Sequence, residues 1–180
     1  IPVIGDAKRG DVGHSSRMYA KAVFETFGCD AVTVTPYLGH DALEPFLDYP
    51  DRGVFVLCLT SNSGANDFQL PNLHLKVAKK VREWNISGNA GLVVGATRPE
   101  NIAAIREISG RMPYLIPGIG TQGGDLRNTL FYADDGSIIP YLISTSRSIL
   151  YASSKEDFAQ QAGTTARKLQ DQINLCRSNL

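Results

Sequence analysis

Charged residues stand close together near the beginning of the sequence, directly after a short apolar run. The stretch Asp6-Ala7-Lys8-Arg9-Gly10-Asp11 places a carboxylate and an ammonium group two residues apart. On a strand, Asp6 and Lys8 point to the same face, where each stabilises the charge of the other. A charged lysine in a water-poor pocket is a good proton donor to a carbanion, and the carboxylate keeps it protonated. Taken alone, the pair is better explained as an ion pair on an exposed loop.

A second polar segment, Thr60-Ser61-Asn62-Ser63-Gly64-Ala65, follows another apolar run. Hydroxyl, amide and backbone N–H groups at the end of a strand can form hydrogen bonds with the edge of a planar heterocycle. In isolation, an ordinary polar turn is the simpler interpretation of this segment.

Two further segments suit a phosphate group. The stretch Pro117-Gly118-Ile119-Gly120-Thr121-Gln122-Gly123-Gly124-Asp125 holds four glycines around one glutamine, so backbone N–H groups could approach a phosphate closely. The alternative is a flexible loop without a ligand. The stretch Ser144-Thr145-Ser146-Arg147-Ser148-Ile149 brings a guanidinium group, whose fork of donors fits a phosphate dianion.

The elements that must position these residues are short apolar runs that alternate with longer amphipathic segments. Each run is a few residues long and rich in Val, Ile or Leu, which is typical of parallel strands buried on both faces. The six runs are Ile1 to Ile4, Ala31 to Val34, Val54 to Leu59, Gly91 to Val94, Tyr114 to Ile116 and Tyr141 to Ile143.

The segments between the runs have the spacing of helices. Ser15 or Ser16 can cap a helix that runs toward Phe27. Ser153 and Glu156 form a capping-box pattern before a long last helix that ends near Leu175. The other predicted helices are Leu73 to Trp84 and one from Pro99 to just before Gly110, with weaker signals at Asp41 to Leu47 and Gly123 to Phe131.

Six alternating strand–helix units predict an α/β fold with a parallel sheet, either doubly wound or closed as a barrel. A (β/α)8 barrel needs eight strands and about 250 residues. Periodicity alone therefore slightly favours an open sheet for this sequence.

Composition excludes several classes of partner. The 180 residues carry 18 basic and 18 acidic side chains, and this balance gives no electrostatic reason to expect nucleic acid or an acidic membrane surface. Cys29, Cys58 and Cys176 are odd in number and widely spaced, which argues against a disulfide framework or a zinc site and favours a reduced, cytoplasmic protein. No apolar run approaches the ~20 residues that span a bilayer, and we expect no signal peptide.

The stretch from Asp6 to Gly13 resembles the Asp-x-Lys-x-x-Asp-Ile/Val-Gly signature of the orotidine 5'-monophosphate decarboxylase suprafamily. Members of this suprafamily are (β/α)8 TIM barrels, and the signature closes their third strand. The resemblance covers nearly the whole chain and reverses the preference for an open sheet. It implies that residues 1–180 form a single barrel domain, from strand three to strand eight, with the first two βα units absent from this chain.

The resemblance also implies roles for individual residues. Asp6 would lie near the substrate carboxylate, and Lys8 would protonate C6 of the pyrimidine as carbon dioxide leaves. Asp11 would reach the active site of a partner subunit, and Ser15 would contact the substrate ribose across the same interface. The expected assembly is a homodimer with shared active sites.

The stretch Leu59-Thr60-Ser61-Asn62 resembles the bacterial type 2 branch of the family, and the glycine-rich loop and Arg147 match patterns of the family as a whole. Thr60 and Ser61 would bind the pyrimidine edge, with Ser61 as the uracil contact and the residues up to Leu70, including Gln69, as a lid. The phosphate would be bound by Pro117, Gln122 and Gly123 of the glycine-rich loop and by Ser146 and Arg147. The stretch Gly91 to Pro99 also resembles this branch, and we interpret it as barrel wall and helix cap.

The function implied is decarboxylation of orotidine 5'-monophosphate to uridine 5'-monophosphate in de novo pyrimidine synthesis, without metal or organic cofactor. Family members carry a further lysine and a ribose-contacting aspartate on their first two strands, and both would lie before Ile1. One alternative is a magnesium-dependent sugar-phosphate lyase or decarboxylase of the same suprafamily. Another is a truncated, non-catalytic nucleotide-binding barrel.

Overall fold

The structure is a computed structural model that describes residues 1–119, 125–138 and 140–179. Within these residues the chain forms six strands that alternate with helices. The strands are β1 (Ile4–Arg9), β2 (Ala31–Val34), β3 (Gly53–Leu59), β4 (Ala90–Val94), β5 (Tyr114–Pro117) and β6 (Tyr141–Ser144). Five of the six predicted strands are confirmed to within one residue at each end.

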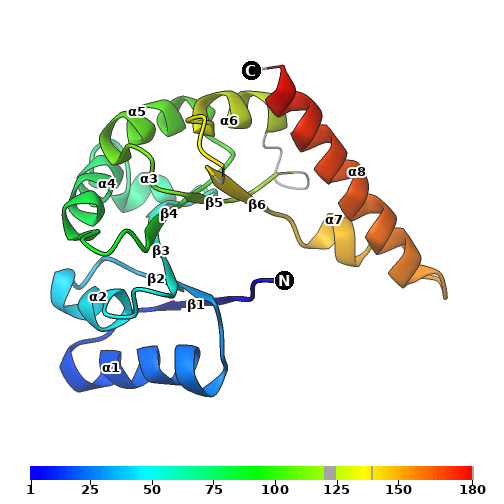
Figure 1. The fold of residues 1–180 in the computed structure, drawn as a ribbon. Helices are drawn as coiled ribbons and strands as arrows, with labels where there is room; N and C mark the ends of the chain where they lie inside the picture. The colour runs from blue at the N-terminus through cyan, green and yellow to red at the C-terminus, as the bar shows by residue number, and fades with distance from the viewer. Residues whose placement is uncertain (120–124, 139, 180) are drawn as a thin grey trace.

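The sheet is entirely parallel, and its strand order follows the sequence from β1 to β6. Each crossover steps to the next position in the same direction, and because such connections are almost always right-handed, the crossover helices are expected on one face of the sheet. Figure 1 shows the curled sheet with α1, α2, α4, α5 and α6 around its outer side. A doubly wound sheet would reverse direction at a switch point, so the strand order excludes that topology. The curled sheet has the order of a barrel, although no pairing between described residues joins β6 to β1.

The helices follow the strands along the chain, and most of them lie on the outer side of the curved sheet. In chain order they are α1 (Gly13–Lys21) continued by the π-helical η1 (Ala22–Thr26), α2 (His40–Leu47), α3 (Ala65–Phe68), α4 (Leu73–Trp84), α5 (Pro99–Ser109), α6 (Leu126–Ala133), α7 (Arg147–Leu150) and α8 (Phe158–Ser178). The long α8 packs against α6 and α7 near the C-terminal end of the chain (Figure 1).

Two predicted helix starts are wrong. The first helix begins at Gly13, and Ser16 lies inside it, where its buried hydroxyl donates to the carbonyl oxygen of Ala42 at 2.6 Å. The last helix begins at Phe158, because the hydroxyl of Ser153 bonds to the carboxylate of Asp157 at 2.6 Å in a turn that precedes the helix. In both cases the serine bonds to a partner other than the free amides of the first helical turn.

Two apolar clusters lie on opposite faces of the sheet. The larger one fills the space between strands and helices and includes Val32, Val56 and Leu92. The smaller one consists of Ala31, Phe55 and Val93, with partly buried neighbours. Because strand residues alternate between faces, Ala31 and its alternating neighbours mark the inner, concave face of the sheet.

The first strand begins later than the apolar run predicts. Ile1 and Val3 are exposed, and the strand runs from Ile4 to Arg9. Asp6 and Lys8 are therefore strand residues rather than residues of a following loop.

No helix among the described residues is long and apolar enough to cross a membrane.

Candidate active site

The Asp6–Lys8 pair lies at the carboxyl end of β1, the edge of a barrel at which active sites are built. The Nζ atom of Lys8 lies 2.6 Å from Oδ1 of Asp6. The side chains of Lys8 and Asp6 are 52% and 64% exposed, so in this chain alone the pair is open to solvent. The arrangement places the side-chain nitrogen of Lys8 against a carboxylate, as the sequence predicts, although not in a water-poor pocket.

The surroundings of Asp6 favour its ionised form. Partial burial raises the pKa of Asp6, but hydrogen bonds from Lys8 and Thr33 and the charge of Lys8 together lower it below its ordinary value of 3.8. The carboxylate is therefore charged at neutral pH, and the pair is lost only as the pH falls below 3.8 and through the lowered pKa. Because both side chains are exposed, solvent screening keeps the contribution of the pair to folding stability small.

The next two predicted residues follow β1. The Oδ1 atom of Asp11 accepts a hydrogen bond from the backbone N–H of Val12 at 2.8 Å, just before α1 begins. Ser15 is exposed on the first turns of α1. No hydrogen bond between described residues joins either side chain to the Asp6–Lys8 pair.

The turn after β3 is fixed by the side chain of Gln69. Its Oε1 atom accepts a hydrogen bond from the backbone N–H of Thr60 at 2.7 Å, and its Nε2 atom donates to the hydroxyl of Thr60 at 2.9 Å. The same hydroxyl donates to the side-chain oxygen of Asn62 at 2.6 Å. Gln69 thus contributes to the shape of the turn that carries Thr60 and Ser61.

The end of β4 supports Ser61 in a way that the sequence analysis missed. Gly95 has no room for a side chain, since a Cβ atom there would lie 2.7 Å from the backbone nitrogen of Ser61. The hydroxyl of Thr97 donates to the carbonyl oxygen of Ser61 at 3.1 Å. The stretch that we interpret only as barrel wall therefore also positions the predicted uracil contact. The sequence does contain a signal for this contact, because a glycine directly after a strand often marks a close approach of another backbone segment.

The predicted phosphate residues gather where β5 and β6 end. A depression of about 160 Å³ is lined by Pro117, Gly118, Ile119, Ser144, Thr145, Ser146 and Arg147. Gly118 has a φ of 103°, a conformation that favours glycine, and it turns the chain away from β5. The predicted residues Gln122 and Gly123 lie outside the described residues.

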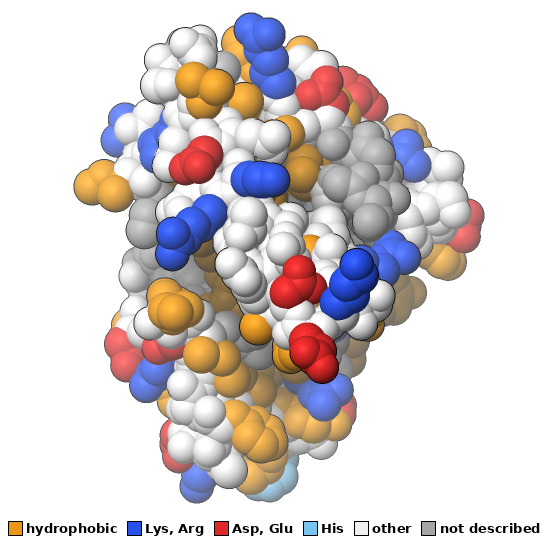
Figure 2. Space-filling model, turned by 90° about the vertical axis from the view of Figure 1, so that its right-hand side faces the viewer, with side chains coloured by type: hydrophobic (Ala, Val, Ile, Leu, Met, Phe, Trp, Pro, Cys, Tyr) orange, Lys and Arg blue, Asp and Glu red, His pale blue; other side chains and the backbone are white. Residues whose placement is uncertain are grey.

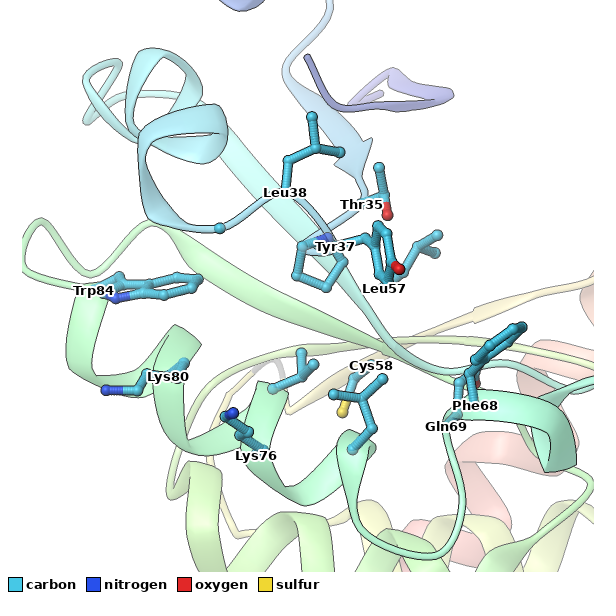
Figure 3. A pocket seen from close by; sticks show the side chains of 14 residues that line it. Thr35, Tyr37, Leu38, Leu57, Cys58, Phe68, Gln69, Lys76, Lys80 and Trp84 are labelled. Carbon is cyan, nitrogen blue, oxygen red and sulfur yellow. The ribbon is translucent and has the colours of Figure 1, made fainter. Parts of the chain in front are cut away.

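A larger groove of about 800 Å³ lies between the segment after β2 and the helix α4. Figure 3 shows Trp84 at one end and Phe68 at the other, with Tyr37 and Leu38 on one side and Cys58 and Lys76 on the other. Its lining is mainly apolar, and it includes neither member of the Asp6–Lys8 pair nor Arg147. The groove adjoins the Thr60 turn through Gln69, which lines its wall.

Other groups with possible chemistry have structural roles. Burial raises the pKa of the Cys58 thiol to about 12, and its Sγ donates to the carbonyl oxygen of His74, so this thiol is not a nucleophile at neutral pH. In the part of the chain that the structure describes, no group of three or more His, Cys, Asp or Glu side chains could hold a metal ion.

Comparisons with known proteins agree with this geometry. The model of the orotidine 5'-phosphate decarboxylase / HUMPS family matches residues 1–162. An orotidine 5'-phosphate decarboxylase of Dehalococcoides mccartyi is 49% identical over 95% of this chain and 67% of its own length. One from Ralstonia nicotianae is 50% identical over 99% of this chain and 68% of its own length. The chain thus spans about two thirds of these relatives.

Solved structures give the same result. The structure of Leishmania donovani OMP decarboxylase has a TM-score of 0.88 and 38% identity, covering 98% of this chain and 68% of that chain. The structure of Leishmania donovani UMP synthase has a TM-score of 0.90 and 40% identity, covering 98% of this chain and 40% of that chain. The match to the family model, the identity to these relatives and the shared fold lead to one conclusion: the chain belongs to the orotidine 5'-phosphate decarboxylase family.

Proposed function

We propose that this protein decarboxylates orotidine 5'-monophosphate to uridine 5'-monophosphate in de novo pyrimidine synthesis. The observation that carries the proposal is the Asp6–Lys8 pair at the end of β1, on the same edge of the sheet as the depression at Arg147. An acid–base pair and a cationic phosphate site on one edge suit a substrate that has a reacting carboxylate at one end and a phosphate at the other.

In the proposed reaction, the bond between C6 and the carboxylate carbon breaks and its electron pair remains on C6. Carbon dioxide leaves, and the ammonium group of Lys8 stabilises the developing carbanion before it transfers a proton to C6. The neutral amine of Lys8 then regains a proton from water. Asp6 keeps Lys8 charged before the reaction and places negative charge near the departing carboxylate. No redox step or electron sink is needed.

The other contacts of the substrate follow the strand ends. Arg147 and Ser146 bind the phosphate beside Pro117, and Gln122 and Gly123 complete the phosphate loop. Thr60 and Ser61 bind the edge of the pyrimidine. The rigid Thr60 turn supports this role, because Gln69 fixes it on one side and Thr97 on the other.

We also propose a homodimer with shared active sites, in which Asp11 and Ser15 act on the substrate of the partner. The exposed apolar side chains Val12, Met18 and Tyr19 on and beside α1 support such an interface. Figure 2 shows hydrophobic side chains gathered on the lower half of one face, the part of the molecule that holds β1 and α1. The expected compartment is the cytoplasm.

The domain assignment is also a proposal. We infer that the 180 residues form strands three to eight of a single eight-stranded barrel. Coverage of about two thirds of the relatives supports this assignment, since six of eight units is a similar share.

The experiment that tests the proposed function is a spectrophotometric assay of the full-length protein with orotidine 5'-monophosphate in the presence of EDTA. We expect chelator-resistant loss of substrate and equal formation of uridine 5'-monophosphate. Activity on a sugar phosphate that requires magnesium would instead support the alternative member of the suprafamily. Nucleotide binding without turnover would support a non-catalytic barrel.

A further inference from the structure

Thr33 on β2 belongs to none of the motifs, yet it contacts both members of the charged pair. It lies within the run Ala31 to Val34, which by sequence alone is an ordinary strand. Its side chain is 1% exposed. Because Thr33 is two residues after Ala31, it points to the same inner face of the sheet, one layer closer to the active edge.

The strand that carries the pair is irregular opposite Thr33. Gly5 pairs with Val32 and Arg9 pairs with Val34, so three residues of β1 face Thr33 alone. Such a bulge removes backbone groups from the ladder of hydrogen bonds and redirects side chains. Lys8 also has a φ of 48°, a left-handed conformation that is unfavourable for a residue with a side chain. A specific contact is needed to hold it there.

The hydroxyl of Thr33 provides this contact in two directions. The backbone N–H of Lys8 donates to Oγ1 of Thr33 at 3.0 Å. The same hydroxyl donates to Oδ1 of Asp6 at 2.8 Å, and this oxygen also accepts the hydrogen bond from Nζ of Lys8 at 2.6 Å. One buried hydroxyl therefore satisfies the amide that the bulge removes from the ladder and fixes the carboxylate that orients the ammonium group.

We propose that Thr33 is a positioning residue of the decarboxylase, which holds the bulged backbone of Lys8 and the carboxylate of Asp6 so that the Lys8 ammonium is aimed at C6. This inference rests on the proposed function. Thr33 acts only through the pair. The hydroxyl is the essential group, because a methyl group in its place could neither accept from the Lys8 amide nor donate to Asp6.

Loss of the hydroxyl has two consequences that a purely structural residue would not have. The Lys8 amide and the Asp6 carboxylate each lose a partner, so the pair adopts other arrangements and the proton transfer becomes slower. Partial burial raises the pKa of Asp6, whereas hydrogen bonds from Lys8 and Thr33 lower it. Removal of the Thr33 hydrogen bond therefore raises this pKa, and Asp6 becomes protonated at a higher pH.

The test compares Thr33→Val, which keeps the shape of the side chain, with Thr33→Ser, which keeps the hydroxyl, in the full-length protein. For Thr33→Val we expect kcat to fall roughly 10- to 100-fold, the size expected for a lost hydrogen bond to a charged group. We expect KM to change by less than about 3-fold, since the lost bond acts on proton transfer rather than on substrate binding. The acid limb of the pH profile of kcat should move to higher pH. Thr33→Ser should recover most of kcat and the original limb.

The control is Ser109→Ala at the end of α5, which removes another buried hydroxyl, one that bonds to the hydroxyl of Tyr114, and should leave kcat and its pH profile unchanged. If Thr33→Val does not fold, Thr33→Ala provides the same comparison without the added methyl group. Wild-type kcat and an unmoved acid limb in the hydroxyl-free variant would overturn the proposal. Equal impairment of Thr33→Ser and Thr33→Val would also overturn it.

A failure of the proposed function is distinguishable from a failure of this inference. If the wild-type protein does not convert orotidine 5'-monophosphate, the proposed function fails. The positioning role is then measured by NMR titration of the Asp6 carboxyl carbon, whose pKa Thr33→Val must still raise. An unchanged pKa in that experiment would overturn the positioning role itself.

Discussion

At the scale of single residues, the proposed mechanism assigns two separate tasks to two cationic side chains. Lys8 is held by a carboxylate at 2.6 Å, which suits a group that must remain charged until it gives up a proton. Arg147 lies at the beginning of α7 and lines a depression formed by backbone and small side chains. A planar guanidinium group that stays charged suits phosphate binding rather than proton transfer.

The first prediction concerns Arg147. We expect Arg147→Ala to raise KM for orotidine 5'-monophosphate roughly 10- to 100-fold, because a charge-assisted hydrogen bond to phosphate is lost. The same variant should leave the turnover of the phosphate-free nucleoside unchanged, since that substrate lacks the group that Arg147 binds. Steady-state kinetics with both substrates provide the measurement.

Arg111→Ala is the matched control for Arg147. Arg111 is exposed and precedes β5, so it lies at the opposite edge of the sheet. Arg111→Ala should leave KM and kcat unchanged with both the nucleotide and the nucleoside. Equal losses with nucleotide and nucleoside in Arg147→Ala would contradict a phosphate contact.

At the scale of elements, the active edge depends on close packing between consecutive strand ends. Gly95 at the end of β4 allows the backbone of Ser61 to approach, and Thr97 then bonds to the carbonyl oxygen of Ser61. At the opposite edge, Arg106 of α5 joins the segments around β5 and β6. Its guanidinium group donates to carbonyl oxygens of Gly110, Met112, Ala133 and Pro140, and it also bonds to Asp135.

The second prediction concerns Gly95. Gly95→Ala would place a Cβ atom 2.7 Å from the backbone nitrogen and 2.8 Å from the Cα of Ser61, so the turn must move. We expect weaker binding of uridine 5'-monophosphate by isothermal titration calorimetry and a lower free energy of unfolding.

In the control Gly163→Ala, on α8, the new methyl group meets no atom within 4 Å. That variant should bind uridine 5'-monophosphate as the wild-type protein does, and its free energy of unfolding should be equal or slightly higher. Normal nucleotide binding by Gly95→Ala would show that Ser61 does not contact the base.

The third prediction concerns Arg106, whose side chain is 13% exposed. Arg106→Met would remove the guanidinium donor from the carbonyl oxygens of Gly110, Met112 and Ala133. It would also remove the cationic partner of Asp135, whose carboxylate keeps the hydrogen bond from the backbone N–H of Ser137. We expect a loss of about 3–5 kcal/mol in the free energy of unfolding, measured with urea. Arg82→Met, which removes one exposed hydrogen bond to the carbonyl oxygen of Ile108, should cost about 1 kcal/mol or less. Equal losses of unfolding free energy in Arg106→Met and Arg82→Met would mean that the hydrogen bonds of Arg106 contribute no more to stability than one exposed hydrogen bond.

The sequence predicts the elements better than it predicts their ends. Runs such as Ala31 to Val34 are correctly predicted because these strands are buried on both faces and therefore consist almost entirely of apolar residues. The first strand was displaced because Asp6 and Lys8 lie at the open inner edge, where charged side chains are tolerated inside a strand. The role of Thr33 could not be predicted, because threonine is common in strands and its partners come from a bulge in another strand.

At the scale of the whole molecule, the curved sheet presents six strand ends along one edge, with the charged pair on β1 and the depression at Arg147 after β5 and β6. The sequence order of the strands, without a reversal, is what distinguishes this arrangement from a doubly wound sheet. It could be predicted only through the resemblance to a family, because alternation of strands and helices is the same in both folds.

The fourth prediction concerns the proposed dimer. Met18, on α1, is 44% exposed, and a charge there would oppose burial against a second copy. We expect Met18→Asp to shift the full-length protein from dimer to monomer by analytical ultracentrifugation and to lower activity at low protein concentration. Ile86→Asp, in the exposed segment before β4, should change neither property. A wild-type protein that is active as a monomer would contradict shared active sites.

The central claim is that Lys8 delivers the proton that replaces the carboxylate, and single-turnover conversion of orotidine 5'-monophosphate in heavy water tests it most directly. We predict that the wild-type protein, with EDTA present, forms uridine 5'-monophosphate that carries deuterium at C6, as any exchangeable donor requires, and the rate of Lys8→Ala then shows whether Lys8 is that donor. Lys8→Ala should lower the rate by at least about 10²- to 10⁴-fold, the usual contribution of a positioned proton donor. It should still bind uridine 5'-monophosphate. A Lys8→Ala rate within 10-fold of the wild-type rate would show that another group protonates C6.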